Sequence, residues 1–363
     1  MNISETKQVS PFFVFFLIHA MQVGIGILTY QRAVTKFSGE DSWLAVPIAT
    51  LVVSIIIWMM YQVLNAHNTD ITEIHKRLFG KWIGGLLTIL FSLYLFLLAV
   101  FILRAYIEVI QVWVFQELQT WHISVLAALF FYSVVSGGFR TVTGLCVVGV
   151  LLPSVLFFFM LIPLEYAHWV NLTIYIDHSF IEILQGALET TLSYLGVEML
   201  LVFYPFIKRA QESQLWAQIG NASTGFVYLV IMLVSIVFYS KEQLQETIWP
   251  TLTMLKIIHL PIIERFEYIG ISLWIVAISP NIGLAIWSAS RGLKNVFLVK
   301  QKYILMFFSI CVAFLPPLFV DRREIEQYGE IISDVGMYVM LVYIPFLYVS
   351  HLIFQRIKKV KEK

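Results

Sequence analysis

One carboxylate within the apolar run 181–203 is the residue best placed to do chemistry. Glu198 follows Gly196 by two residues, and a carboxylate inside a membrane is costly unless it is paired or protonated. It can contact the ammonium group of a ligand or act as a proton-linked latch. It can equally bond backbone groups that a helix break at Gly196 leaves free, and the sequence leaves both interpretations open.

Two glycines, Gly24 and Gly26, interrupt the apolar run 11–30. Each weakens a helix by about 1 kcal/mol and lets a ligand approach the backbone. Close helix packing is the alternative role of such glycines. Because Gly196 interrupts a second helix at a matching position, the pattern favours a ligand cavity near the middle of the membrane. Freed N–H and C=O groups can bind a small ligand there.

Other residues extend this candidate site. Pro280 removes a backbone hydrogen bond from another apolar run, so that Asn281 can bond a freed carbonyl or a ligand. A plain proline kink is the alternative. Leu98 and Leu195 would give the cavity an aliphatic wall, which favours a small apolar amino acid as ligand.

Catalytic and metal-binding motifs are missing from the sequence, which contains no GxSxG, no HExxH and no phosphate-binding glycine loop. No His, Asp or Glu pair has metal-ligand spacing, and Cys146 and Cys311 lie in apolar runs without a CxxC partner. A net charge of +1 gives no general attraction to nucleic acid. We expect a protein that is not an enzyme and has no metal, no cofactor and no nucleic-acid partner.

Long apolar helices must position these residues. Of the 363 residues, 59% are hydrophobic and 13% are charged, whereas soluble domains carry about 25% charged residues. Apolar runs of about 20 residues recur along the chain and predict an all-α polytopic membrane protein. We expect ten transmembrane helices, at about 11–30, 43–64, 83–103, 123–136, 143–163, 181–203, 216–240, 268–289, 303–320 and 335–354.

Lys and Arg residues are unequally divided between the two sides of such a bundle. The side with both termini and the even-numbered turns carries sixteen, and the other side carries eight. This excess predicts cytoplasmic termini, including a basic tail at 355–363, and it supports an even number of helices.

The helices form two halves within a single membrane domain, 1–363. The first half covers 11–163 and the second covers 181–354. Because each half has five helices, the second must be inverted relative to the first, as is typical of secondary transporters. The first and sixth helices then correspond, and both carry glycine interruptions.

Two connections on the outer side are longer than minimal turns. The first, 241–267, contains an apolar stretch at 252–266 that predicts a helix in the membrane interface, with a packed loop as the alternative. The second, 321–334, carries five acids and two arginines and predicts a solvated loop.

Six short motifs follow one another along the range 11–354. They are Gly24-Ile25-Gly26-Ile27-Leu28, Gly80-Lys81-Trp82-Ile83-Gly84, Gly137-Gly138, Gly196-Val197-Glu198-Met199, Trp249-Pro250-Thr251 and Glu264-Arg265-Phe266-Glu267. Their order and spacing resemble the spore germination permease family, the B subunits of Ger-type nutrient germinant receptors. That family belongs to the amino acid–polyamine–organocation superfamily. One departure is Gln31, because the family often has proline at this position, before the arginine that is Arg32 in this sequence.

The resemblance implies a LeuT-like fold, with ten helices in a 5+5 inverted repeat and broken helices 1 and 6. It implies a pocket between helices one, three, six and eight, with Tyr94 and Leu98 in its wall. It also implies a sensor of small nutrients, often amino acids. That sensor would work with an A subunit and a lipoprotein C subunit in the lipid bilayer of the spore inner membrane.

The main alternative is an amino acid symporter of the same fold, and a purely structural membrane subunit is a third. The expected ligand-binding residues are Gly24, Gly26, Tyr94, Leu98, Leu195, Gly196, Glu198, Pro280 and Asn281.

Overall fold

The computed structural model describes residues 3–172, 175–259 and 264–361. Within these ranges all regular elements are helices, and one isolated backbone bridge joins Val9 to Ile207. The α-helices are α1 (Phe13–Gln22), α2 (Tyr30–Ser38), α3 (Ser42–His67), α4 (Ile71–Trp113), α5 (Thr120–Ser136), α6 (Phe139–Leu151), α7 (Ser154–Phe159), α8 (Phe180–Leu192), α9 (Leu200–Phe203), α10 (Gln214–Phe238), α11 (Lys241–Glu246), α12 (Pro250–Lys256), α13 (Phe266–Phe297), α14 (Gln301–Phe314), α15 (Arg322–Tyr338) and α16 (Ile344–Lys361).

Seven helical segments of the described residues are long and apolar enough to cross a membrane, so the chain is a membrane protein. A bent pair, Phe180–Leu192 with Val197–Phe206, turns by 53° at its break and adds an eighth when it is counted as one span. Phe13–Gln22 and Thr120–Ser136 are apolar but shorter. Each of the ten predicted ranges contains helix. The seven segments are Tyr30–His67, Ile71–Trp113, Phe139–Tyr166, Ala210–Phe238, Phe266–Phe297, Gln301–Leu318 and Arg322–Ile357.

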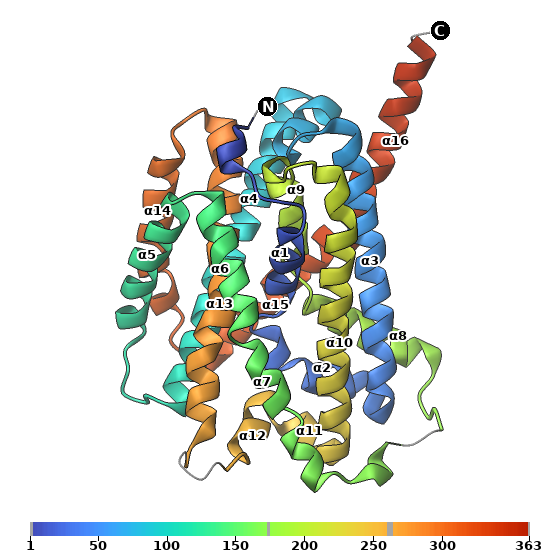
Figure 1. Ribbon diagram of the computed structural model, residues 1–363, viewed down its shortest axis with the longest axis vertical. Coiled ribbons are helices and arrows are strands. Elements are labelled where there is room, and N and C mark those ends of the chain that lie inside the picture. Colours follow the sequence, from blue (N-terminus) through green and yellow to red (C-terminus); the bar gives the residue numbers. More distant parts are fainter. Residues whose placement is uncertain (1–2, 173–174, 260–263, 362–363) are drawn as a thin grey trace.

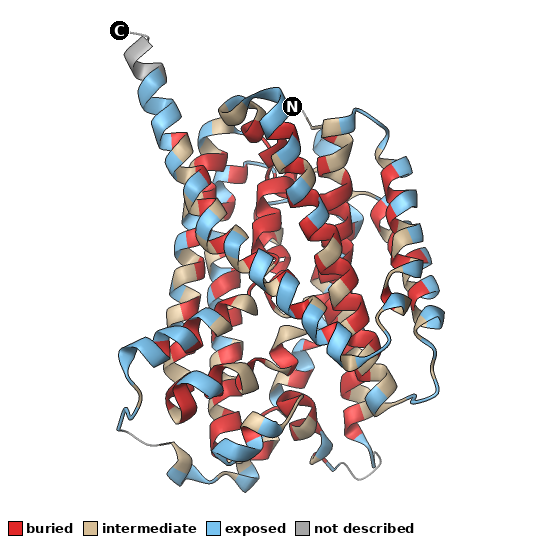
Figure 2. Cartoon of the chain, turned by 180° about the vertical axis from the view of Figure 1, so that it is seen from behind, coloured by how far each residue is buried: buried red, intermediate tan, exposed pale blue. Residues whose placement is uncertain are grey.

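The long helices run side by side along the longest axis of the molecule, and both termini lie at the same end (Figure 1). α1 lies in the centre against α6 and α10, while α13 packs along α4. α5 and α14 form an outer pair. Buried residues gather on the inner helices, and exposed residues cover the outward faces (Figure 2). Large apolar side chains such as Leu126 and Phe158 are among the exposed ones, which suits contact with lipid tails.

Gly80 bends the long helix α4 between its first turns and its apolar part. Its φ of +79° is a conformation that L side chains rarely adopt, and a Cβ there would meet no atom within 4 Å. The backbone conformation, and not lack of space, therefore requires glycine. The bend brings Gly84 so close to His75 that a Cβ on Gly84 would lie 2.6 Å from the His75 carbonyl.

The predicted solvated loop at 321–334 is wrong, because this segment begins helix α15. Asp321 and Glu324 form a capping box that starts the helix. One face of the helix is apolar or small at helical spacing and packs against α4, which places the charged residues on the opposite face. Because the segment carries many charged residues, the helical spacing of its apolar and small residues is not apparent in the sequence. The buried residues are Ile325, Gly329, Ile332 and Gly336.

The predicted interfacial helix at 252–266 is replaced by the shorter helix α12, which covers seven residues, Pro250–Lys256. α12 packs against α13 and against the short 3-10 helix Gly26–Leu28, and most of its side chains are buried. It is therefore a buried helix that packs against α13. Residues 260–263 of the predicted range lie outside the described residues.

Candidate ligand-binding site

The first apolar helix is interrupted at its two glycines. α1 ends at Gln22, and a short 3-10 helix, Gly26–Leu28, leads into α2. The N–H groups of Gly24 and Ile25 make no backbone hydrogen bond within the described residues. The break therefore offers two backbone donors to a ligand.

Side chains from other helices bond the carbonyls that the same break releases. Nδ2 of Asn281 in α13 donates to the carbonyl oxygens of Ala20 at 3.0 Å and Met21 at 2.8 Å. The hydroxyl of Tyr228 in α10 donates to the carbonyl of Gln22 at 2.9 Å. The open end of α1 is thus held between α10 and α13 by polar side chains.

The sixth helix is interrupted after α8. Gly196 has a φ of +108°, which favours glycine, and α9 begins only at Leu200. Glu198 is fully buried within this break. Its Oε2 accepts from the backbone N–H of Gly196 at 2.8 Å, and its Oε1 accepts from the Tyr94 hydroxyl at 2.7 Å. The carboxylate therefore satisfies backbone that the break frees and ties it to α4.

The two breaks lie against each other. A Cβ on Gly26 would approach Oγ of Ser193 to 3.2 Å, and a Cβ on Gly196 would approach Cε of Met21 to 3.0 Å. Small residues at these positions thus let the broken backbones meet, as glycines in membrane helices commonly do.

A cavity of about 230 Å³ lies beside this meeting point. It is bounded by both breaks, by α4, by α13 and by α15. Its volume suits a small ligand better than a drug-sized one, because pockets for the latter start near about 300 Å³. The lining residues are Met21, Gly24, Ile25, Gly26, Thr29, Tyr30, Ala33, Leu98, Phe101, Ile102, Glu189, Leu192, Ser193, Leu195, Asn281, Ile332 and Ser333.

The structure brings most of the predicted site residues to this cavity. Gly24, Gly26, Leu98, Leu195 and Asn281 line it. The remaining four are next to it in the fold without lining it. Three of these, Tyr94, Gly196 and Glu198, form the hydrogen-bonded group within the sixth-helix break, and Pro280 is buried beside Asn281 against Gly149 of α6.

Sequence reasoning missed four polar residues of the lining, namely Thr29, Glu189, Ser193 and Ser333. Glu189 and Ser193 are four residues apart at the end of α8, a spacing that puts them on one face and could have revealed them. Ser333 was hidden because its segment was expected to be a loop.

Among the described residues, Glu189 is the only acidic or basic side chain in the lining. Its side chain is half-buried, and the charges of Lys36 and Asp334 act on it. No lysine or arginine lines the cavity, so the local charge favours a ligand with a cationic group. Within the described residues no group of three or more His, Cys, Asp or Glu could hold a metal ion.

A second, more apolar cavity of about 280 Å³ lies beside the same segment of the first helix. It shares no lining residue with the first cavity. Ala20, Val23 and Ile27 line it, together with residues of α6, α7, α10, α12 and α13. His19 also faces it and forms a hydrogen bond with Thr224 through Nδ1 at 2.8 Å. The broken segment therefore has open space on two sides.

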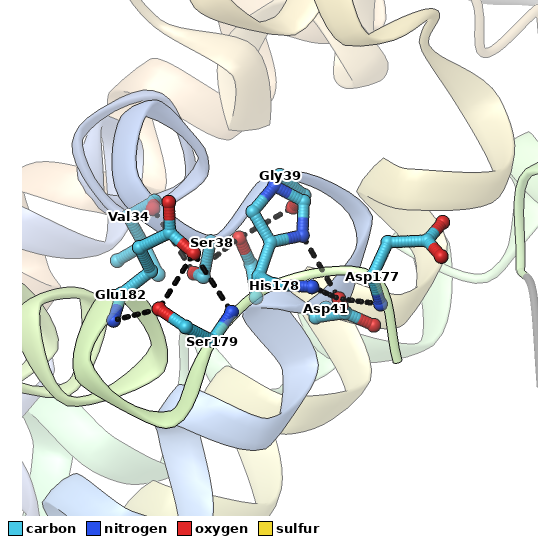
Figure 3. A network of polar contacts seen from close by, with 9 residues as sticks. Val34, Ser38, Gly39, Asp41, Asp177, His178, Ser179 and Glu182 are labelled. Carbon is cyan, nitrogen blue, oxygen red and sulfur yellow. Dashed lines mark hydrogen bonds and ion pairs between the residues drawn. The ribbon is translucent and has the colours of Figure 1, made fainter. Parts of the chain in front are cut away.

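The helices that adjoin the two breaks, α2 and α8, pack against each other. A polar cluster at their ends fixes this arrangement (Figure 3). Oδ2 of Asp41 accepts from the backbone N–H groups of Asp177 and His178, each at 3.0 Å, and lies 2.9 Å from Nδ1 of His178. Ser179 and Glu182 form a capping box that starts α8 in the same cluster. α2 and α8 are thus held together as one unit, the α2–α8 unit.

Comparison with known structures shows the fold. A substrate-bound, outward-open Na+-coupled sialic acid symporter superposes with a TM-score of 0.65 at 11% identity, over 93% of this chain and 78% of the symporter. MHP1, a nucleobase-cation-symport-1 family transporter, superposes with a TM-score of 0.58 at 12% identity, over 94% of this chain and 82% of that chain. These proteins have the LeuT-like fold, so the fold of this chain is that of a transporter.

Comparison with known sequences shows the family. The chain is 40% identical to Spore germination protein GerQB of Bacillus cereus over 94% of this chain and 95% of that protein. It is 23% identical to Spore germination protein YndE of Bacillus subtilis (strain 168) over 93% and 94% of the two chains. The family model for "Spore germination protein" matches residues 8–324. The chain therefore belongs to the spore germination permease family.

Proposed function

We propose that this chain is the nutrient-sensing subunit of a spore germinant receptor and binds an amino acid in the cavity between its two helix breaks. The observation that carries this proposal is the composition of that cavity. It joins an acidic side chain, Glu189, and free backbone donors at Gly24 and Ile25 to an aliphatic wall. An amino acid has the complementary groups, namely an ammonium, a carboxylate and a side chain.

The ligand would lie between these groups in a defined orientation. Its ammonium group would face Glu189, and its carboxylate would accept from the N–H groups of Gly24 and Ile25. Its side chain would pack against Leu98 and Leu195. An aliphatic amino acid would therefore fit better than a sugar.

Signalling would follow from the way the cavity is built. The α2–α8 unit forms one wall, while α4, α13 and α15 form the others. A ligand that contacts both walls stabilises the conformation in which they are closest, in proportion to its preference for that conformation. The A and C subunits of a germinant receptor would respond to this closed conformation, and no enzymatic step is required.

We further propose the complete arrangement in the membrane. Ten helices form a 5+5 inverted repeat, with 11–163 as the first half and 181–354 as the second. The breaks after α1 and α8 support this, because they fall in the first helix of each half. The common end of both termini would be cytoplasmic, given the excess of lysine and arginine there, and the membrane would be the spore inner membrane.

Nutrient-triggered germination of spores that carry Gly26→Leu tests the ligand site. The side chain would fill the contact between Gly26 and Ser193, where a Cβ alone comes within 3.2 Å of Oγ. We expect loss of response to specific nutrients at a normal protein level in immunoblots. Gly144→Leu is the matched control, because Gly144 is exposed on α6 and a Cβ there meets no atom within 4 Å. An unchanged response in Gly26→Leu spores would remove the site from this cavity.

A working amino acid symporter is the alternative, and the fold shared with two symporters favours it. Vesicles that contain the purified chain distinguish the two functions. Accumulation of a radiolabelled amino acid would establish transport, whereas saturable binding without accumulation would establish a sensor.

A further inference from the structure

The contact between Asn281 and the end of α1 has an unusual composition. One amide nitrogen donates to two successive backbone carbonyls, those of Ala20 and Met21, at 3.0 and 2.8 Å. Asn281 is 2% exposed. Its Oδ1 has no hydrogen-bond partner in the part of the chain that the structure describes. Both hydrogens of the NH2 group are therefore used at the helix break, at the expense of the oxygen.

These two carbonyls are free because the helix ends. In a continuous helix they would accept from the N–H groups of Gly24 and Ile25, which make no backbone hydrogen bond with any residue that the structure describes. Unwound carbonyls at the midplane of a membrane protein are the groups that coordinate a coupling cation such as Na+. Hard cations prefer such oxygen ligands. The break thus exposes the type of donor set that a cation would use.

We propose that the Asn281 carboxamide takes the place of a coupling cation and joins the first-helix break to α13 without Na+. The NH2 group presents two partial positive charges to the two carbonyls and is fixed by its covalent bond to α13. A cation at this point would meet the amide hydrogens, which repel it.

The side chains around Asn281 are consistent with an uncharged link between the first-helix break and α13. The nearby acid Glu198 has both oxygens engaged, by the Tyr94 hydroxyl and by the Gly196 N–H. The hydroxyl of Ser279 donates back to Ile275 in its own helix at 2.6 Å. Both side chains are thus oriented by hydrogen bonds to other groups, and the contact of Asn281 with Ala20 and Met21 consists of uncharged groups.

The consequence goes beyond the proposed function, because it concerns ions and not the nutrient. Whatever ligand the cavity takes, the wall formed by α1 and α13 is already assembled in a medium without sodium. Binding of the ligand in the cavity would then be independent of a sodium gradient. The test below uses Na+ alone as probe, so its failure can be distinguished from a failure of the nutrient-sensing proposal.

Thermal unfolding of the purified full-length chain tests the inference. The melting temperature would be compared in NaCl and in choline chloride at equal ionic strength. We expect the native chain to melt at the same temperature in both salts. We expect Asn281→Asp to melt lower in choline chloride and to recover by about 3 °C or more in NaCl, with a saturable dependence on Na+. The introduced aspartate carboxylate and the carbonyls of Ala20 and Met21 would then form a negatively charged set of oxygen ligands.

Asn221→Asp is the matched control. Asn221 is also a buried asparagine. Its Nδ2 donates to the Thr50 carbonyl and to Ser54 Oγ of α3, and its Oδ1 accepts from Nε2 of Gln22. This variant should lose stability without a specific response to Na+. If Asn281→Asp does not fold, Asn281→Ser replaces it, because the serine frees at least one carbonyl and adds a hydroxyl oxygen.

Two results would overturn the proposal. One is a saturable rise of the native chain's melting temperature with Na+ but not with choline, which would mean that a cation site exists beside the amide. The other is a folded Asn281 variant without any Na+ response, which would mean that the carbonyls are not arranged as a cation site.

Discussion

The hydroxyl of Tyr94 donates a hydrogen bond to Oε1 of Glu198 over 2.7 Å, although 104 positions separate them in the sequence. The bond joins α4 to the break between α8 and α9. Because the second carboxylate oxygen accepts from Gly196, the Glu198 side chain holds the bent backbone and the neighbouring helix together. Movement at the sixth-helix break must therefore strain or break at least one of these two bonds.

Removal of the phenolic hydroxyl should destabilise the fold. Tyr94→Phe leaves one oxygen of a buried carboxylate without its donor, at a cost of about 1–3 kcal/mol in the free energy of unfolding. Thermal unfolding of the purified protein measures this loss. Tyr132→Phe, at an exposed tyrosine of α5, is the control and should melt like the native chain. Equal melting temperatures for the Tyr94 and Tyr132 variants would contradict the role of this bond.

Glu198→Gln should impair the nutrient response while leaving the protein in the membrane. The amide keeps one accepting oxygen, but its NH2 group would face a donor at Tyr94 or at Gly196. Germination would be measured over a range of nutrient concentrations, with the protein level followed by immunoblot. Glu330→Gln, an exposed change on α15, serves as control. Normal germination at every nutrient concentration would contradict the prediction.

Glu189 should determine the charge of the ligand that is accepted. Glu189→Gln removes a charge-assisted contact of about 1.5–3 kcal/mol, so the nutrient concentration for half-maximal response should rise about 10- to 100-fold. Glu189→Lys should abolish the response to amino acids. Neutral nutrients such as sugars provide the comparison, because their potency should change little with Glu189→Gln. A similar loss for charged and neutral nutrients would point to a structural role.

Gly196→Ala should be destabilising for two reasons. The backbone has a φ of +108°, and the added Cβ would lie 3.0 Å from Cε of Met21. Strain of this kind costs about 1–3 kcal/mol. Gly144→Ala, where a Cβ meets no atom within 4 Å, should leave the melting temperature unchanged. Should both variants melt alike, the bend at Gly196 would not need glycine.

Asp41→Ala should loosen the α2–α8 unit. The buried Asp41 carboxylate accepts from two backbone N–H groups and faces the His178 ring. Its loss leaves these donors unpaired, which lowers the free energy of unfolding by about 1–3 kcal/mol. His178→Ala removes only the ring and should cost less. Limited proteolysis between α7 and α8 would report the difference. The opposite order of sensitivity would contradict the assignment of Asp41 as the centre of the cluster.

Sequence reasoning could locate the two helix breaks because glycine position is a local property. Gly24, Gly26 and Gly196 mark the breaks directly, since few other residues allow the close contacts and the positive φ found there. The family resemblance added Tyr94 and Leu98, which periodicity alone does not single out among many apolar neighbours.

What sequence reasoning missed depends on tertiary contacts. The first helix continues as α2 to Ser38, and α15 begins at Arg322, because charged segments become helical when one face packs against the bundle. Glu189 is not among the residues expected from the sequence. Its spacing from Ser193 puts both on one face of α8, but which surroundings that face meets depends on how α8 lies beside α2 and α15.

The two cavities beside the first-helix break have a consequence for motion. The segment from Val23 to Leu28 lies between volumes of about 230 and 280 Å³ that share no lining residue. A displacement of this segment toward one cavity would enlarge the other by a similar amount. The number of close atomic contacts around it would then stay nearly constant, and so would the dispersion energy. A ligand that fills one cavity could therefore select the position of the segment without having to compress the surrounding helices.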